Sequence, residues 1–441
     1  MLRSLLLSCL LASSAAAQSP PDFSAVDDLI ADSLNLIGGG ATVLVMQDGE
    51  VLHRTGYGSY TTTSVKATAS GAKWLSAGVI ASLISDGTLT LDDSLAMFFP
   101  SLEGDKRAIT VRQMFSHTSG MSGNESGGRT PCALNRLTTL EACAEIILER
   151  PLVRAPGAAF DYGVNSMHVA GRVAEIASGQ SWVDLFDQRI AQPLGMTATE
   201  YTSATNPWIA GGMRTTVDDY GTFLQMLLNG GVHEGTRVLS ASSVEAMLAD
   251  QTGNAPIAYS PYEDYAGYPG LSLTERVYGL GVWRERATPD GTLLDGSSLG
   301  GFGFSPWIDT ERRLVGVLLV EDRLPDVMGT YLELKRLIRE IVDGGAVASS
   351  SAPDSGLRLD APSPNPARQR ATVRFELATP SWARLVLTDA RGRRVAVLDS
   401  RRRSAGNHLV PFDLRRFAPG VYRVVLRTRD GRRVQPLTIV R

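Results

Sequence analysis

The chain has 441 residues, enough for two or three domains with a large core, and its 20% charged and 7% aromatic residues are typical of globular proteins. The net charge of −3 hides an asymmetry. From Ala361 onward there are 18 arginines and five acidic residues, about +13, so the preceding part carries about −16. An acidic body followed by a basic segment predicts separate modules. No aromatic-rich motif accompanies the arginines, which argues against a nucleic-acid partner.

The first 17 residues are typical of a secretory signal peptide. Arg3 is followed by the apolar run Leu5–Leu11 and by the small residues Ala15-Ala16-Ala17. We therefore predict cleavage before Gln18 and a secreted or cell-surface protein, periplasmic if no further export step follows. No later run reaches about 18 apolar residues, so the sequence predicts no transmembrane segment.

Two cysteines, Cys132 and Cys143, remain after removal of the predicted signal peptide. In an oxidising compartment such a pair predicts a disulfide that closes a short loop. Two buried free thiols are the alternative.

The body of the chain, residues 18–343, begins with two strands, continues with a long helical middle and ends with strands and a helix. The runs 41–47 and 51–57 are predicted strands joined by Asp48-Gly49, a favourable hairpin turn. Helices are predicted at 70–85, 110–116, 140–149, 166–177, 182–190, 216–229, 240–249 and 328–342, and later strands at 279–284, 292–295, 303–308 and 314–321. This order predicts an α+β fold in which helices flank an antiparallel sheet.

Residues 344–356 (GGAVASSSAPDSG) have the composition of a linker. After them, short alternating runs at 371–377, 383–388 and 421–428 are separated by glycine or proline turns. That spacing predicts a small β-sandwich over residues 357–441.

The tetrad Ser70-Gly71-Ala72-Lys73 opens the first predicted helix, and positions three apart lie on one helix face. Serine is a weak nucleophile until a base takes its proton, and a crowded lysine can have its pKa lowered enough to do so. The tetrad therefore suggests a nucleophile and its base, although it is a weak signal by itself.

Further motifs follow along the chain. They are His117-Thr118-Ser119-Gly120, Phe160-Asp161-Tyr162, Pro193-Leu194-Gly195-Met196, Gly211-Gly212-Met213, Leu228-Asn229-Gly230-Gly231 and Tyr278-Gly279-Leu280-Gly281. In order and spacing, from Phe23 to Val342, the chain resembles the serine hydrolases of the class C β-lactamase and penicillin-binding-protein superfamily. The resemblance implies an antiparallel-sheet domain beside an all-helical subdomain, with the active site between them.

The resemblance implies roles for three catalytic residues. Ser70 would be the acylated nucleophile, Lys73 its proton acceptor or relay, and Tyr162 a base that ionises well below its usual pKa of about 10. A cleft-wall tyrosine is the alternative for Tyr162. The asparagine that the family often has two places after this tyrosine is Val164 here, so Asn165 is the candidate to replace it. We expect no metal and no cofactor.

The third family motif, Lys or His followed by Ser or Thr and Gly, corresponds to Asp295-Gly296-Ser297, with Ser298 next. A cation there would bind a substrate carboxylate, and Asp295 would repel it. We therefore expect a small-molecule substrate that is a neutral ester or amide, or carries an amine. The backbone N–H groups of Ser70 and Ser298 are the candidate oxyanion hole, with Ser297 beside them.

Several alternatives stay open or are weighed. Gly296–Gly300 matches the G-x-S-x-G nucleophile elbow, but a strand follows it, and the later His408 lies beyond the linker. Five scattered histidines lack metal-ligand spacing, and we expect His117 and His168 to be structural. A β-lactamase, a D-Ala-D-Ala carboxypeptidase or D-aminopeptidase acting on cell-wall peptides, and a non-catalytic peptide-binding protein are the alternative functions.

The segment after the linker carries Pro364-Asn365-Pro366, Ala405-Gly406 and Pro419-Gly420-Val421-Tyr422. It resembles the C-terminal sorting domain of type IX secretion cargo, an immunoglobulin-like sandwich that carries proteins across the outer membrane. The resemblance implies the outer-membrane secretion machinery as a partner. An accessory β-sandwich that binds glycan or spaces the enzyme is the alternative.

Overall fold

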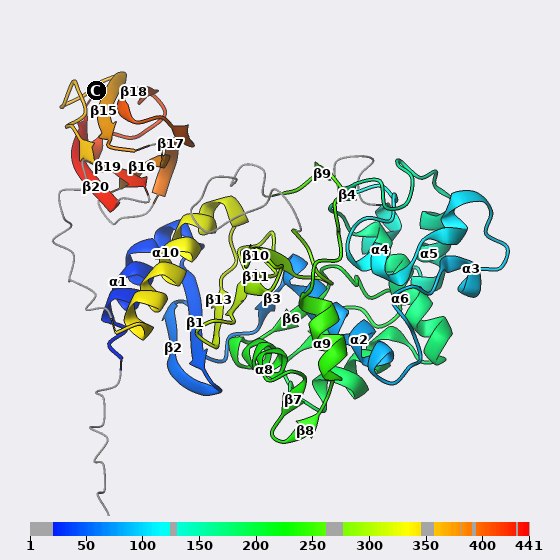
Figure 1. Cartoon of the computed structure of the whole chain (residues 1–441). Helices are drawn as coiled ribbons and strands as arrows, with labels where there is room; N and C mark the ends of the chain where they lie inside the picture. Colours follow the sequence, from blue (N-terminus) through cyan, green and yellow to red (C-terminus); the bar gives the residue numbers. More distant parts are fainter. Residues whose placement is uncertain are drawn as a thin grey trace, which may run out of the picture.

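The structure is a computed structural model of the chain, shown in Figure 1, and it describes residues 21–123, 130–261, 277–344, 357–379, 381–389, 394–428 and 431–440. The predicted signal peptide, residues 1–17, and residues 345–356 of the predicted linker lie outside the described residues. Within the described part of the chain, no helix is long and apolar enough to cross a membrane.

The helices are α1 (Ser24–Ser33), α2 (Ala72–Ser85), α3 (Leu95–Phe98), α4 (Val111–Phe115), α5 (Leu140–Glu149), α6 (Asn165–Ser178), α7 (Trp182–Phe186), α8 (Val217–Leu228), α9 (Ala241–Leu248) and α10 (Leu324–Val342). The strands are β1 (Gly40–Gln47), β2 (Glu50–Gly58), β3 (Lys66–Ala67), β4 (Phe160–Asp161), β5 (Glu200–Tyr201), β6 (Met213–Thr215), β7 (Val232–His233), β8 (Thr236–Arg237), β9 (Ile257–Tyr259), β10 (Trp283–Ala287), β11 (Leu293–Ser297), β12 (Ser305–Asp309), β13 (Leu314–Leu319), β14 (Arg358–Leu359), β15 (Arg370–Leu377), β16 (Ser381–Asp389), β17 (Arg394–Arg403), β18 (Gly406–Asp413), β19 (Gly420–Thr428) and β20 (Gly431–Ile439).

A six-stranded antiparallel sheet of order β10-β11-β12-β13-β1-β2 organises the body. The predicted hairpin at Asp48-Gly49 joins β1 to β2, and β1 pairs on its other edge with β13. Because side chains alternate along a strand, Leu44 packs into one apolar cluster while Val43 and Val45 pack into the other. The sheet therefore separates two cores.

Helices cover both faces of this sheet, as Figure 1 shows. Helices α1 and α10 pack together on the face of Val43 and Val45, and α8 packs against β1, β12 and β13 on the opposite face. Helix α2 is buried from Ala72 to Leu83 and leads from the sheet into the part that contains α3 to α7. This arrangement confirms the predicted combination of an antiparallel sheet with helices.

Two local features near the start of α2 differ from the prediction. Ser70 lies in a 3-10 turn, Ala69–Gly71, just ahead of the α-helix rather than inside it. Strand β10 begins at Trp283, not at residue 279, because the preceding residues bend against α2. Gly281 has φ 71° in this bend, and a Cβ there would lie 2.2 Å from the carbonyl oxygen of Lys73. Only glycine fits this contact.

The C-terminal segment forms two sheets, β14-β15-β18 and β17-β16-β19-β20. Their inner side chains share one apolar cluster, to which the first sheet contributes Val373 and Phe375 and the second Leu385 and Leu426. These are the C-terminal sheets that the alternating pattern predicts. Their immunoglobulin-like character and their sorting role stay predictions.

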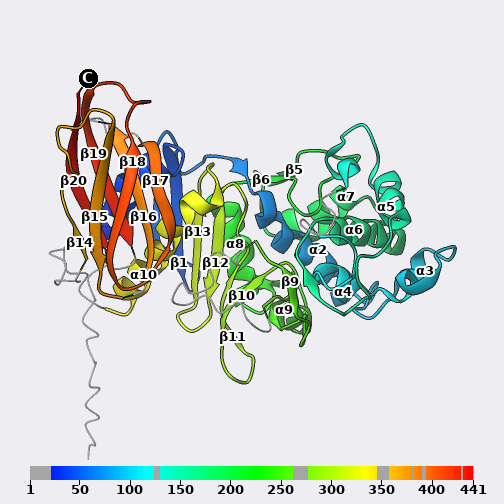
Figure 2. The same cartoon turned by 90° about the horizontal axis from the view of Figure 1, so that it is seen from above.

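The outer face of the second of these sheets packs on helix α10, a contact that we did not predict. Val386 and Val425 belong to the same apolar cluster as the inner face of α10. Beside them the Arg384 guanidinium pairs with the Asp326 carboxylate, and the two side chains are only 12% and 14% exposed. Figures 1 and 2 both place the C-terminal sheets beside α10 and away from α3 to α7. The basic segment and the acidic body therefore meet at a largely buried ion pair.

We predict that this ion pair fixes the C-terminal sheets against the body. In Arg384→Glu two carboxylates face each other in a nearly dry contact, so the segment should detach and the radius of gyration measured by small-angle X-ray scattering should rise by several ångström. The charge swap Arg384→Glu with Asp326→Arg should restore the compact value. Arg374→Glu, on the exposed side of β15, is the matched control and should leave the radius of gyration unchanged. An unchanged radius in Arg384→Glu would contradict the prediction.

Candidate active site

The turn that carries Ser70 has an unusual backbone. Ala69, directly before the serine, has φ 45° and is only 5% exposed. A non-glycine residue in this left-handed region is disfavoured and persists where its surroundings fix it. Here the N–H of Thr68 donates to the carbonyl of Met213 (3.0 Å), which ties the turn to β6. Ser70 itself stays partly exposed at the end of the buried helix α2.

Lys73 is buried directly behind Ser70. Its ammonium Nζ donates to Ser70 Oγ (3.2 Å) and to the carbonyl of Ala210 (2.9 Å). No carboxylate within the described residues forms an ion pair with it, and burial lowers the pKa of Lys73 to about 7. A large fraction of this lysine is therefore uncharged near neutral pH, as a base for the serine proton requires.

Tyr162, directly after strand β4, is the third member of this group. Its hydroxyl lies beside the side chains of Ser70 and Trp283, and the Lys73 Nζ lies 4.8 Å from its ring centre. Burial raises the pKa of Tyr162, which is the opposite of the predicted shift. The Lys73 Nζ faces the aromatic ring, and burial outweighs the effects of Ser70 and Trp283, which favour the phenolate. Tyr162 is thus a neutral hydrogen-bond donor beside the nucleophile.

An aromatic cluster surrounds Lys73 and Tyr162. The ring centres of His117 and Tyr162 are 4.7 Å apart, those of His117 and Tyr278 5.0 Å, and those of Tyr162 and Trp283 5.1 Å. Burial, and then the nearby Lys73 charge, hold the pKa of His117 well below its usual value. A neutral imidazole suits the predicted structural role. Trp283 matches no motif in the sequence, and only the fold brings it to Tyr162.

Ser298 holds the nucleophile turn rather than an oxyanion. Its Oγ lies within hydrogen-bond distance of the carbonyls of Ser70 (3.2 Å) and Gly281 (3.0 Å). Its backbone N–H donates to the carbonyl of Pro306 across the strand pair (3.3 Å). The predicted oxyanion role of the Ser298 amide is therefore not what the structure favours, because that amide already has an acceptor.

Asp295 and Ser297 do not reach Ser70. The Asp295 carboxylate is 1% exposed and pairs with Arg286 (2.8 Å) and with Arg339 of α10 (2.5 Å). Ser297 Oγ donates to the buried Glu285 (2.5 Å), also on the α10 side of the sheet. The predicted repulsion of a substrate carboxylate by Asp295 is wrong, because alternation along β11 turns this side chain to the opposite face and two arginines neutralise it.

Asn165 is also engaged away from the nucleophile. Its amide nitrogen donates to the backbone carbonyl and the hydroxyl of Ser122, both at 3.0 Å, and its amide oxygen accepts from the N–H of Thr130 (3.0 Å). These bonds hold the segments on either side of residues 124–129, which are not described. Asn165 therefore fixes the wall next to Tyr162, and the structure gives it no contact with Ser70.

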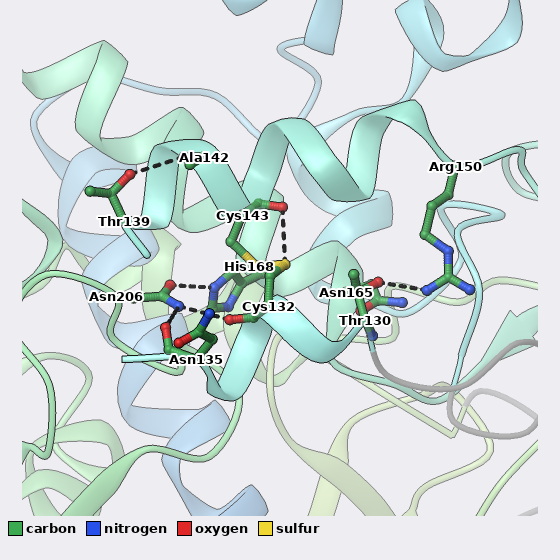
Figure 3. Close-up of a disulfide and its surroundings, with 10 residues drawn as sticks. All are labelled: Thr130, Cys132, Asn135, Thr139, Ala142, Cys143, Arg150, Asn165, His168 and Asn206. Carbon is green, nitrogen blue, oxygen red and sulfur yellow. Dashed lines mark hydrogen bonds between the residues drawn. A yellow bond between two sulfur atoms is a disulfide. The ribbon is translucent and has the colours of Figure 1, made fainter. Parts of the chain in front are cut away.

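The predicted disulfide is confirmed between Cys132 and Cys143, with an S–S distance of 2.01 Å and Cα atoms 5.4 Å apart. Figure 3 shows that Asn206 supports the same loop: its amide nitrogen donates to the carbonyls of Cys132 and Asn135, both at 2.9 Å. The amide oxygen of Asn206 then accepts from His168 Nε2 (2.9 Å). Burial lowers the pKa of His168 to about 4, so it stays neutral in this structural network.

No group of three or more His, Cys, Asp or Glu side chains in the described part of the chain could hold a metal ion. The candidate site consists of the side chains of Ser70, Lys73 and Tyr162, which the structure brings together. An activated serine next to a buried, weakly basic amine and a phenol is equipped for acyl transfer.

A family profile described as Beta-lactamase matches residues 27–338. The chain belongs to the Beta-lactamase family. Penicillin-binding protein 4 of Amycolatopsis lactamdurans is 28% identical over 347 residues, which cover 67% of this chain and 89% of that protein. A β-lactamase-like protein from Bacteroides dorei DSM 17855 is 30% identical with a TM-score of 0.65, covering 73% of this chain and 99% of that chain.

A solved family VIII carboxylesterase has the same fold at 18% identity and a TM-score of 0.54, over 69% of this chain and 94% of that chain. These findings confirm the predicted β-lactamase and penicillin-binding-protein superfamily, whose members are serine hydrolases. They do not bear on the C-terminal sheets, because the family match ends at residue 338.

We predict that Lys73→Met stabilises the protein while removing its base. The pKa of this lysine is about 7 in the folded chain, and we take its ordinary value of 10.5 for the unfolded chain. Between pH 7 and pH 10.5 the unfolded chain therefore binds more protons than the folded chain, so the stability of the wild type rises with pH. The free energy of unfolding of Lys73→Met should exceed that of the wild type by about 2–5 kcal/mol below pH 7, and this difference should shrink towards pH 10.5. Urea unfolding at several pH values measures it.

The matched control is Lys66→Met, which removes a partly exposed lysine paired with Glu321. It should lower stability slightly and show no comparable gain at low pH. A Lys73→Met variant that is less stable than wild type at pH 6 would contradict the buried, uncompensated charge.

Proposed function

We propose that this protein is a secreted serine hydrolase that forms an acyl-enzyme on Ser70 and acts on esters or amides without a carboxylate near the scissile bond. One observation carries the proposal: Ser70 Oγ lies 3.2 Å from the Nζ of a buried lysine whose pKa is about 7, and the Tyr162 hydroxyl lies beside it. Membership of the Beta-lactamase family supports the same reaction class.

The proposed reaction begins with transfer of the Ser70 proton to the uncharged Lys73 Nζ. The serine oxygen then forms a bond with the substrate carbonyl carbon, and the bond to the leaving group breaks as that group takes a proton from the Tyr162 hydroxyl. Protonated Lys73 restores the phenol. Water then attacks the acyl carbon and gives a proton to Lys73; the acyl–serine bond breaks, Lys73 returns this proton to the Ser70 oxygen, and the acid is released. The neutral state of Tyr162 suits its role as proton donor.

The charge around the nucleophile supports a neutral substrate. Among the described residues, Lys73 is the cation that contacts Ser70, and its proton is used in the reaction. Arg286 and Arg339 bind Asp295 on the other side of the sheet. Within the described part of the chain, a free carboxylate beside the scissile bond has no cation other than Lys73 to bind, which disfavours the β-lactamase and D-Ala-D-Ala carboxypeptidase alternatives.

The non-catalytic alternative is a protein that binds cell-wall peptide without turnover. Against it stands the geometry of Ser70, Lys73 and Tyr162. A binding protein gains nothing from burying an unpaired lysine, which costs stability.

The location of the protein is a separate part of the proposal. We propose that the signal peptide of residues 1–17 directs it to the periplasm and that the C-terminal sheets engage the outer-membrane secretion machinery. The disulfide between Cys132 and Cys143 supports an oxidising compartment. The docked sheets lie beside α10 rather than at Ser70, which supports a role apart from catalysis.

We predict that a fluorophosphonate probe labels the wild-type protein on Ser70. The labelling rate should rise with pH through about 7, because uncharged Lys73 is the base, and it should level off above that. Ser70→Ala should abolish labelling, which gel fluorescence and peptide mapping would detect. Labelling that persists in Ser70→Ala on Ser298 would instead support the nucleophile-elbow alternative.

We also predict a preference for substrates without a carboxylate. With p-nitrophenyl butyrate and the hemisuccinate ester as a matched pair, kcat/KM should favour the neutral ester by at least tenfold, on the order of one missing charged contact. Turnover of a chromogenic cephalosporin should be lower than that of the neutral ester by at least about a hundredfold. Faster hydrolysis of the cephalosporin than of the ester would overturn the proposed substrate class.

A further inference from the structure

Two hydroxyl groups, one from Tyr220 of helix α8 and one from Ser298 directly after β11, contact the carbonyls of the nucleophile turn. The Tyr220 hydroxyl, fully buried, donates to the carbonyl of Gly71 (2.6 Å). The Ser298 hydroxyl lies 3.2 Å from the carbonyl of Ser70, on the side chain next to Tyr220. The successive carbonyls of Ser70 and Gly71 are therefore each within hydrogen-bond distance of one of two neighbouring hydroxyls.

Tight packing fixes the ring of Tyr220 under this turn. The ring meets Phe304 edge to face at 5.0 Å between centres and lies 6.1 Å from Phe223. The turn rests on the same phenylalanine, because a Cβ at Gly71 would come 2.6 Å from Phe304 Cδ1. The Gly71 backbone, Phe304 and Tyr220 thus form one close-packed stack with no room for a shift.

The turn needs such support for its chemistry. Ala69 holds a left-handed conformation that an isolated turn would leave. At 3.2 Å, the bond between Lys73 Nζ and Ser70 Oγ is at the long end of the hydrogen-bond range. A small displacement of the turn would separate the nucleophile from its base, and catalysis depends steeply on such displacements.

Packing alone does not explain a tyrosine at this position. Tyr220 lies on the buried side of α8 with Phe223, Leu224 and Leu227, where phenylalanine would fill the same space. The hydroxyl adds only the bonds to the turn. We propose that Tyr220 is a positioning residue for the nucleophile, whose hydroxyl holds the Gly71 carbonyl and so keeps Ser70 within reach of Lys73. This inference rests on the proposed function of Ser70.

The proposal has its own signature in the pH profile. Burial raises the pKa of Tyr220 well above its usual value, so this hydroxyl stays protonated throughout an ordinary assay. Its loss should therefore lower the reactivity of Ser70 by the same factor at every pH. The midpoint near pH 7 belongs to Lys73 and should not move.

The test compares two phenylalanine substitutions that each remove one buried phenol. Tyr220→Phe removes the bond to the nucleophile turn. Tyr201→Phe is the matched control, because Tyr201 bonds to Ser76 on the same helix α2 (2.7 Å), and Ser76 keeps its own bond to the carbonyl of Ile209 (2.6 Å). For each variant we would measure the thermal midpoint, kcat and KM with p-nitrophenyl butyrate, and the second-order rate of fluorophosphonate inactivation.

Tyr220→Phe should lower kcat and the inactivation rate about tenfold, the effect of one lost hydrogen bond, with KM within about twofold of wild type. Tyr201→Phe should stay within about twofold in all three while losing a similar amount of thermal stability. In a cycle with Ser298→Ala, the effects on kcat should be non-additive, since the two hydroxyls hold one turn.

Three outcomes would overturn the inference: unchanged reactivity in Tyr220→Phe, an equal loss in Tyr201→Phe, or full additivity with Ser298→Ala. If Tyr220→Phe did not fold at 37 °C, the same rates at 10 °C would decide, since that temperature lies near maximal stability for most domains. A wild-type protein that neither hydrolyses the ester nor reacts with the probe would overturn the proposed function itself, which distinguishes the two failures.

Discussion

Lys73 is buried, no carboxylate among the described residues pairs with it, and the chemistry of the site follows from this state. A lysine in this position is stable in the fold only if it gives up its proton easily, and that property makes it a base for Ser70. The surroundings that produce this state come from distant parts of the chain: the Ala210 carbonyl on one side and the Tyr162 ring on the other. The same dry environment keeps Tyr162 and His117 neutral.

The sheet separates this unpaired lysine from a group of paired charges. Behind β10 and β11, Glu285 pairs with Lys335 (2.5 Å), and Asp295 pairs with Arg286 and Arg339. Charges in those positions are largely neutralised by their partners, so they give the strands a fixed attachment to α10 without an excess charge near the nucleophile. The ion pairs thus lie on the face of the sheet that α10 covers, and the reactive lysine lies on the other side.

Helix α10 connects this support to the C-terminal segment. Its inner side carries Tyr331, Lys335 and Arg339 against the sheet, and Asp326 near its start binds Arg384 of the C-terminal sheet. Strand β16 is apolar on both faces for this reason: Leu385 enters the core between the two C-terminal sheets, and Val386 packs towards α10. The apolar residues on both faces of β16 therefore reflect two contacts, one inside the C-terminal segment and one with α10.

Features that depend on neighbouring residues or on a short motif could be predicted from the sequence. The Asp48-Gly49 hairpin, most of the helices, the pairing of Cys132 with Cys143, and the spacing of Ser70 and Lys73 all follow from local patterns. Helix boundaries agreed with prediction within a few residues because caps and periodicity are local. Ser70 lies in a 3-10 turn rather than in the predicted helix, because contacts with β6 and with Ser298, both far along the chain, shape that turn.

The electrostatics of the site, in contrast, depend on the tertiary structure and could not be predicted from local patterns. In β11 a shift of one residue exchanges the two faces of a strand, so the sequence could not show that Asp295 points to α10 and binds arginines from β10 and α10. The pKa of Tyr162 was predicted in the wrong direction because it depends on burial, and burial is a sum over the whole fold. The contacts of Asn165, Trp283 and Tyr220 join segments far apart in the chain, and only the packed molecule brings them together.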